Sequence, residues 1–178
     1  MDATRNLGKG LAVLRVALGA GFLYAGLDKV LHFGEVAAKP FDAAGFLKFA
    51  TAGTAPGVDA ASKAVVNPTN GFWVSLAANA DLMSAINFLV VFGEIAIGVA
   101  LILGLATRFA AVMGTLMMGL FWIASWDFAH GLVNEQFLYA VVAGFLAYAG
   151  AGEYYGLDAI IERTATVRNS PALKYVLG

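Results

Sequence analysis

The strongest constraint on the fold is an apolar stretch at residues 86–106 that contains a single ionisable side chain, Glu94. At about 1.5 Å per residue, a helix of this length crosses the hydrocarbon core of a bilayer, which is roughly 30 Å thick. A carboxylate near the middle of such a helix costs about 3 kcal/mol or more to insert if it faces lipid. We therefore expect residues 86–106 to form a transmembrane helix with Glu94 turned toward protein.

The spacing of the polar residues identifies the inward face of this helix. Positions seven residues apart lie on one side of an α-helix. Here that side carries polar residues, one leucine and two glycines, whose lack of a side chain keeps the face thin and allows another helix to approach closely. The residues are Asn87, Glu94, Gly98, Leu101, Gly104 and Arg108. We interpret it as the face turned into a helical bundle, and the functional predictions below depend on it.

The composition places the chain among membrane proteins and excludes several functions. It is 60% hydrophobic and 13% charged, with a mean hydropathy of +0.77, whereas a soluble domain is about 25% charged. A net charge of −1 argues against nucleic-acid binding, which needs a clustered basic face. The chain has no cysteine, and its two histidines lie outside the middle of the apolar runs. We therefore expect no haem, no iron–sulfur cluster and no metal site.

Three further apolar stretches, at residues 7–28, 109–126 and 132–152, complete a predicted bundle of four transmembrane helices. The first contains Arg15, and its length and internal charge favour a retained span over a signal peptide. Glycines at about four-residue spacing share the face of Arg15, a pattern that lets helices approach closely in lipid. We predict an all-α integral membrane protein with one domain.

That domain, residues 1–178, has a long extracytoplasmic loop at residues 29–85 and a cytoplasmic tail at residues 153–178. Within the loop, Pro40 favours the start of a short amphipathic helix that buries three phenylalanines, Phe41, Phe46 and Phe49. The residues from Asn67 to Gly71 read as a turn.

The distribution of Lys and Arg predicts the orientation. The cations of the termini and of the short turns fall on one side of the membrane: Arg5, Lys9, Arg108, Arg163, Arg168 and Lys174. The turn at residues 127–135 has no Lys or Arg, and the long loop is expected to translocate largely regardless of its charge. We expect a multi-pass protein of the cell membrane with both termini in the cytoplasm.

This topology gathers the polar residues into two groups. The outer pole comprises Asp28, Lys29, His32, Asn87, Glu94, Trp126, Asp127, His130, Glu135 and Gln136, and the inner pole comprises Arg15, Arg108, Tyr154, Tyr155 and Asp158. A direct Arg15–Glu94 ion pair is not favoured, because the two Cα atoms differ in depth by roughly 8 Å and the side chains lean apart. We expect Arg15 to bind tyrosine or carbonyl partners, and Glu94 to face Lys29 or His130.

Several of these residues are candidates for binding and chemistry. A small anion needs donors and positive charge, and the substrate-binding candidates are Arg15, Lys29, His32 and His130. Trp122 and Trp126, one turn apart, are candidates for walling a quinone headgroup. Glu94 is the candidate catalytic residue, accepting or relaying a proton.

Structural alternatives stay open beside these roles. Arg15 and Glu94 would also serve simply to lock the helix register. The tryptophans would also serve as packing, and Arg108 fits a cation at a cytoplasmic helix end.

Two motifs in the sequence resemble those of the DoxX family. The first is Arg15-x-x-x-Gly19-x-x-Phe22-x-x-x-Gly26-x-x-Lys29, and the second is Glu94-x-x-x-Gly98-x-x-Leu101-x-x-Gly104-x-x-Thr107-Arg108-x-Ala110-Ala111. Gly156-Leu157-Asp158 is similar to the end of the family pattern. The likeness covers the four predicted spans but not residues 30–85.

The resemblance implies a membrane subunit of a quinone-linked redox system, of the DoxD-like type found in thiosulfate:quinone oxidoreductase. Its cofactor would be a quinone and its substrate a small sulfur anion such as thiosulfate. Expected partners are the lipid bilayer, a soluble redox partner or second subunit, and a further copy of the chain. An alternative is a non-catalytic scaffold that docks a soluble redox partner through residues 30–85 and the tail. A small-solute carrier has little support, because the sequence shows no inverted repeat.

Overall fold

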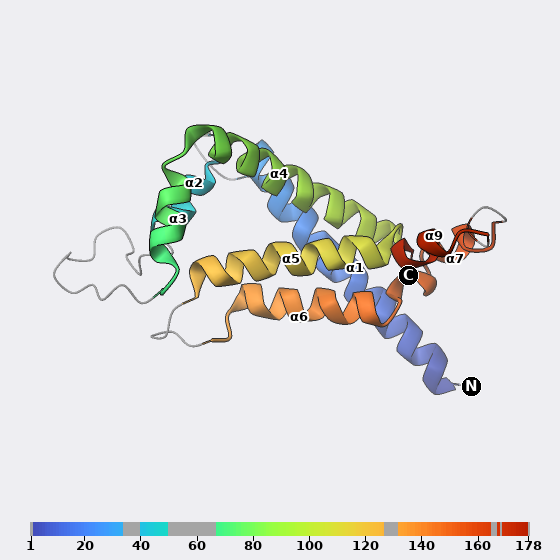
Figure 1. Cartoon of the computed structure of the whole chain (residues 1–178). Helices are drawn as coiled ribbons and strands as arrows, with labels where there is room; N and C mark the ends of the chain where they lie inside the picture. The colour runs from blue at the N-terminus through green and yellow to red at the C-terminus, as the bar shows by residue number, and fades with distance from the viewer. Residues whose placement is uncertain are drawn as a thin grey trace.

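The structure, a computed structural model, describes residues 2–33, 40–49, 67–126, 132–164, 167 and 169–177. Within these ranges the regular secondary structure is entirely helical. Among the described residues, three helices are long and apolar enough to cross a membrane: Arg5–Leu31 within α1 (Asp2–Leu31), α4 (Ala80–Leu103) and α5 (Thr107–Ser125) (Figure 1). The all-α membrane class is therefore confirmed.

The fourth predicted span corresponds to a shorter helix. α6 (Glu135–Tyr148) is apolar but has 14 residues, and such a helix is about 21 Å long, less than the thickness of the hydrocarbon core. It begins at Asn134, whose side chain accepts a hydrogen bond from the amide of Phe137. A short 3-10 helix, η2 (Ala151–Glu153), follows it. A fourth crossing stays a prediction.

The range predicted as an outer loop, residues 29–85, contains helices. It holds the end of α1, then α2 (Ala43–Phe49), α3 (Asn70–Ala77) and the first turns of α4. α4 begins six residues earlier than the apolar run because the Asn79 side chain accepts a hydrogen bond from the amide of Leu82, and Asp81 suits a helix N-terminus. Residues 34–39 and 50–66 lie outside the described part of the chain.

The long helices are arranged as two antiparallel pairs. α1 packs along α4, and α5 packs along α6, with α1 crossing behind α5 (Figure 1). Both chain termini and the turn between α4 and α5 lie at one end of the molecule, which we call the terminal end; α2 and α3 lie at the opposite end, the loop end (Figure 1). α7 (Asp158–Ile161) and α9 (Pro171–Val176) lie at the terminal end.

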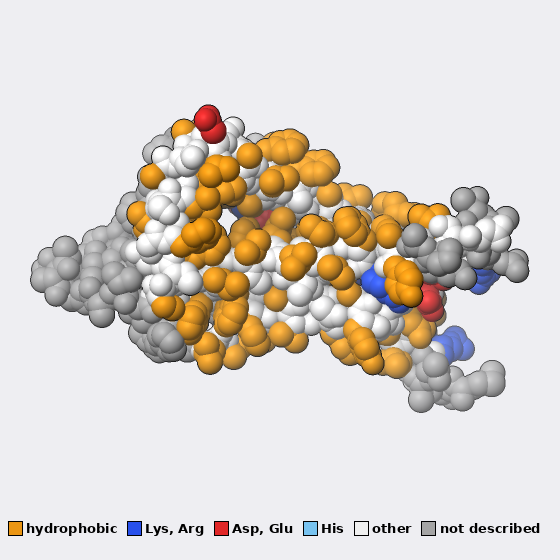
Figure 2. Space-filling model, in the orientation of Figure 1, with side chains coloured by type: hydrophobic (Ala, Val, Ile, Leu, Met, Phe, Trp, Pro, Cys, Tyr) orange, Lys and Arg blue, Asp and Glu red, His pale blue; other side chains and the backbone are white. Residues whose placement is uncertain are grey.

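Two apolar clusters hold this arrangement together. The main one joins the four long helices and centres on fully buried residues such as Leu101, Ala111, Ala143 and Leu146. The second lies at the loop end and joins α2 and α3 to the start of α4 and the end of α5. The outward faces of the helices are apolar as well (Figure 2). Apolar surface on this scale suits contact with lipid rather than water.

Candidate functional site

A line of glycines brings α1 and α4 into close contact and so positions the site. A Cβ atom on Gly98 would lie 2.5 Å from the amide nitrogen of Leu23, and one on Gly19 would lie 2.9 Å from the carbonyl oxygen of Gly98. Nearer the loop end, a Cβ on Gly26 would lie 3.1 Å from the Cβ of Glu94. The predicted thin face on each helix is confirmed, because both faces are buried against one another.

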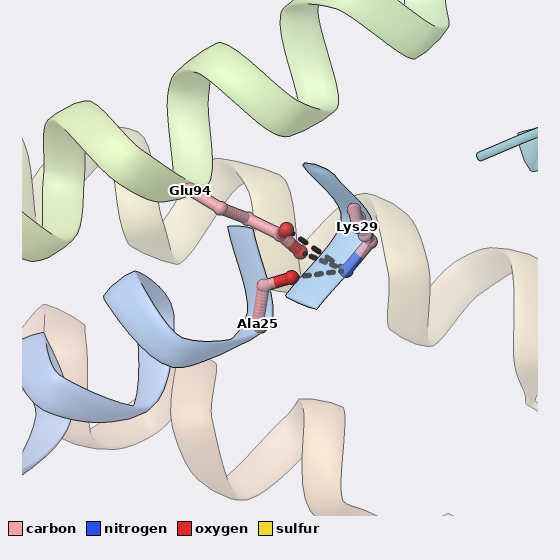
Figure 3. Close-up of polar contacts among 3 residues, drawn as sticks. All are labelled: Ala25, Lys29 and Glu94. Carbon is pink, nitrogen blue, oxygen red and sulfur yellow. Dashed lines mark hydrogen bonds and ion pairs between the residues drawn. The ribbon is translucent and has the colours of Figure 1, made fainter. Parts of the chain in front are cut away.

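The site is an ion pair between these two helices. The Lys29 Nζ lies 2.8 Å from Oε2 of Glu94 and 3.0 Å from Oε1 (Figure 3). It also donates to the carbonyl oxygen of Ala25, one turn earlier on α1, at 3.3 Å. The Glu94 side chain is 3% exposed and that of Lys29 is 21% exposed. Of the two partners predicted for Glu94, the structure therefore pairs it with Lys29.

A segment at the loop end covers the ammonium group. The ring of Phe41 lies over Lys29, with its centroid 5.3 Å from Nζ, a cation–π arrangement. The following helix, α2, is fixed to α4 because the Asn87 side-chain oxygen accepts a 2.9 Å hydrogen bond from the amide of Ala43. Asp42 accepts from Asn87 and from the amide of Ala44. Phe41 is thus held above the ion pair by backbone and side-chain contacts.

The α5 side of the site is apolar. Residues 109–125 contain no ionisable side chain, and Met117 packs at Gly93, next to Glu94 in sequence. Figure 2 shows a small recess between α4 and α5 in which basic and acidic atoms are visible on an otherwise apolar face. An ion pair in such surroundings interacts more strongly than in water and offers both hydrogen-bond donors and acceptors. It can bind a polar headgroup and exchange protons with it.

Arg15 lies elsewhere, near the terminal end. Its Nη1 donates to the carbonyl oxygen of Ala151 at 2.8 Å, and its Nη2 donates to that of Tyr155 at 3.3 Å. The expectation of carbonyl partners is confirmed. Arg15 is 1% exposed and lies about 21 Å along α1 from Lys29, so the structure does not bring these two candidate substrate-binding residues together.

Asp158 organises the terminal end in a way that sequence reasoning missed. Its carboxylate accepts hydrogen bonds from the amides of Ala106 at 2.7 Å and Thr107 at 2.8 Å, so it caps α5 from a distant point in the chain. The turn it caps has positive φ at Gly104 (65°) and at Ala106 (48°). The motif Gly156-Leu157-Asp158 was the available signal, because a Cβ on Gly156 would lie 3.0 Å from the carbonyl oxygen of Gly104.

The two candidate tryptophans, Trp122 and Trp126, lie at the loop end of α5. Their rings stack with centroids 5.9 Å apart, and Trp122 also contacts the ring of Phe137 on α6 at 5.5 Å. The Trp122 Nε1 donates to the carbonyl oxygen of Leu132. These contacts place Trp122 on the α6 side of α5, whereas the aromatic ring beside the ion pair is Phe41.

The remaining candidates are distributed as follows. His32 follows the last residue of α1, with a positive φ of 52°, and lies one turn beyond Lys29. His130 lies outside the described residues. Arg108 donates to the carbonyl oxygen of Ala147, at the end of α6, in keeping with a structural role. No group of three His, Cys, Asp or Glu side chains suited to a metal occurs in the described part of the chain.

The structural role of Asn67, a buried residue at the loop end, was not predicted from the sequence, which indicated only a turn in this segment. The Asn67 side chain, 2% exposed, donates to the carbonyl oxygens of Ile123 and Ala124 in the last turn of α5. Its oxygen accepts from the amide and hydroxyl of Thr69. Carbonyls at a helix C-terminus need such partners, so Asn67 joins the start of α3 to the end of α5.

Comparison with known proteins gives one family. Residues 57–177 match the model of a family described as "TQO small subunit DoxD". The matched range covers more than half of the chain and includes Glu94, Asp158 and both tryptophans, but not α1. No curated protein and no solved structure matches the chain.

Proposed function

Because this chain belongs to the DoxD family, we propose that it is a membrane subunit of a quinone-linked redox system of the thiosulfate:quinone oxidoreductase type. The observation that carries the proposal is the Lys29–Glu94 pair at 2.8 Å, which joins the middle part of α4, at Glu94, to the last turn of α1, at Lys29. A buried carboxylate within a membrane-length helix is costly, which makes Glu94 a candidate functional residue. The family description "small subunit" supports a partner subunit as well.

The proposed reaction balances as follows. Two thiosulfate ions each lose one electron and join through a new S–S bond. The two electrons, with two protons, reduce one quinone to its quinol. In this proposal Glu94 passes protons to the quinone, and its position as the acidic residue within the apolar run of α4 supports that role. The electrons pass through the quinone or a partner.

The two substrates approach from different sides in this proposal. Thiosulfate meets Lys29, His32 and His130 from the loop end, where donors and positive charge are available. The quinone enters from the bilayer between α4 and α5, where the recess visible in Figure 2 exposes polar atoms. Trp122 and Trp126 were the candidate walls for its ring, but Trp122 contacts α6, and Phe41 is the aromatic ring next to the pair. Arg15, paired with backbone carbonyls, serves to fix α1 to the residues that follow α6.

The proposed topology is a four-span bundle of the cell membrane. α6 and η2 together provide the fourth crossing, and both termini, which lie at the same end of the molecule (Figure 1), face the cytoplasm. The short α6 would be accommodated by local thinning of the bilayer.

The test is thiosulfate-dependent reduction of decylubiquinone in membranes that contain the full chain. We expect Glu94→Gln to lower the rate by about tenfold or more, because general acid–base groups contribute roughly 10²–10⁴-fold. The matched control is Glu153→Gln, which removes an exposed carboxylate at the terminal end and should leave the rate unchanged. Equal rates in wild type and Glu94→Gln would remove the catalytic role of the pair.

A second candidate is a scaffold that docks a redox partner without chemistry of its own. It is favoured by exposed apolar side chains on the tail, among them Ile160 (65% exposed) and Tyr175 (75% exposed). Crosslinking with mass spectrometry separates the two. A stoichiometric partner that stays bound in Glu94→Gln membranes, where the quinone reductase rate is unchanged, supports the scaffold.

A further inference from the structure

We propose that Lys29 and Glu94 form a coupled site that binds one small anion together with one proton. The anion takes the place of the Glu94 carboxylate on Lys29, and Glu94 becomes a neutral carboxylic acid. This inference rests on the proposed function, because that function places the anion at Lys29. Beyond that function, it states that the site takes up a proton on Glu94 when the anion binds to Lys29.

Lys29 is already surrounded by partners. An ammonium group has three N–H donors and no acceptor. In the structure Nζ donates to Oε1 of Glu94 and to the carbonyl oxygen of Ala25, and it lies 2.8 Å from Oε2 of Glu94 (Figure 3). The ring of Phe41 lies over it, with the centroid 5.3 Å away. An incoming anion therefore competes with the Glu94 carboxylate for the ammonium group.

The displaced carboxylate finds no other Lys or Arg among the described side chains around it, and the other group on this part of α1 that can become cationic is His32. α1 contributes Asp28, Lys29 and His32 at this level, and the segment before α2 contributes Asp42. α5 contributes no ionisable group, since residues 109–125 contain none. The cation Arg15 is about 21 Å away along α1 and is bound to carbonyl oxygens.

A buried carboxylate does not stay charged without a partner. The Glu94 side chain is 3% exposed, and removing one member of a buried ion pair leaves the other with a large desolvation cost. Uptake of a proton removes that cost. It also converts Glu94 from an acceptor into an O–H donor, so that Lys29 and Glu94 together offer the anion two donors of different kinds.

The coupling has a measurable consequence. If binding of one anion takes up one proton, the affinity for the anion falls by about tenfold for each unit rise in pH. This holds in the pH range in which Glu94 is ionised in the free protein. Because thiosulfate carries two negative charges, the proton taken up offsets one of them, which lowers the cost of placing the anion at membrane depth. Protons are thereby loaded next to the position proposed for the quinone.

The experiment is calorimetric titration of the purified full chain in lipid nanodiscs with sodium thiosulfate, between pH ~7 and ~8, in HEPES and in Tris. Thiosulfate does not titrate in this range, and the difference in heat between the two buffers counts the protons taken up. We expect one proton per thiosulfate for wild type and for Glu153→Gln. For Glu94→Gln we expect no proton uptake and a pH-independent affinity.

Other outcomes overturn the proposal in distinguishable ways. Thiosulfate binding by wild type without proton uptake removes the coupling and leaves the proposed function standing. Uptake that persists in Glu94→Gln but disappears in His32→Gln assigns the proton to the histidine and contradicts the role of Glu94. No detectable binding by wild type removes the coupled site together with the anion-binding part of the proposed function. The wild-type measurement does not depend on any variant folding.

Discussion

The carboxylate of Asp158 accepts a hydrogen bond from the amide of Thr107, 51 residues earlier in the chain, at a distance of 2.8 Å. With its second oxygen on the amide of Ala106, it satisfies the first free N–H groups of α5. Asp158 is fully buried. The start of the third long helix is thus completed by the tail of the protein.

We predict that Asp158→Ala destabilises the fold by about 2 kcal/mol, because it removes a helix cap and leaves the buried amide of Thr107 and the partly buried amide of Ala106 without this acceptor. Thermal unfolding in detergent, followed by circular dichroism, measures the effect. Glu153→Ala, which removes an exposed carboxylate five residues earlier, should unfold like wild type. An Asp158→Ala protein as stable as wild type would show that water replaces the cap.

The glycine contact between α1 and α4 gives a second prediction. Gly98→Ala places a methyl group 2.5 Å from the amide nitrogen of Leu23, so the helices must separate, at a cost of about 1–3 kcal/mol. The control is Gly119→Ala on α5, where a Cβ would meet no atom within 4 Å. That control should be neutral or stabilising by up to about 1 kcal/mol, because alanine is the better helix former. Similar unfolding temperatures for the two variants would contradict the close packing.

Removing one member of the ion pair should cost more than removing both. Lys29→Met leaves Glu94 buried without its cation and should destabilise by about 3–5 kcal/mol, whereas adding Glu94→Gln should recover much of that loss. A double-mutant cycle of unfolding free energies measures the coupling. Additive effects of the two substitutions would mean that the 2.8 Å contact contributes no coupling.

The anchoring of α2 by Asn87 can be tested separately from the ion pair. Asn87→Ala removes the acceptor of the Ala43 amide, so amide hydrogen exchange in residues 41–47 should accelerate by about fivefold or more, the equivalent of losing one hydrogen bond of about 1 kcal/mol. Exchange in α5 should not change. Ser84→Ala, an exposed polar substitution one turn earlier on α4, is the control. Unchanged protection at residues 41–47 would show that the apolar contacts of α2 suffice.

The fourth crossing has a direct test, since the chain contains no native cysteine. Val133→Cys lies before α6 and Thr164→Cys lies beyond η2, and both positions are exposed. If α6 and η2 span the membrane, a membrane-impermeant maleimide applied to intact cells labels Val133→Cys but not Thr164→Cys until the cells are opened. Labelling of both positions from the same side would place α6 on the membrane surface.

The inward faces of the long helices could be predicted from the sequence because they depend on local periodicity and on the cost of charge in lipid. On α1, Arg15 shares one face with glycines, and on α4, Glu94 does the same; the heptad spacing identifies both faces. Helix geometry also correctly disfavoured a direct Arg15–Glu94 pair. The partner of Glu94 was narrowed to Lys29 or His130, and the structure selects Lys29.

The rest depends on contacts between distant segments, which periodicity does not encode. Asn67 and Asp158 complete opposite ends of α5 from separations of more than 50 residues. The sequence indicated only a turn at Asn67, and at Asp158 a polar position and a short motif without a partner. The start of α4 was placed too late because polar residues such as Asn79 and Asp81 form a helix N-terminus, which a search for apolar runs excludes.

The seven-residue helix α2 limits how far apart α4 and α5 can lie. At the terminal end, α4 and α5 are tied by a tight turn. At the loop end they are bridged by α2, which is bonded to Asn87 on α4 and whose Phe46 ring meets Phe121 of α5 at 5.9 Å. The distance between α4 and α5 at the depth of Glu94 is therefore limited at both ends, by the turn and by α2. A molecule broader than the space between these two helices would have to displace α2 before it could contact the Lys29–Glu94 pair.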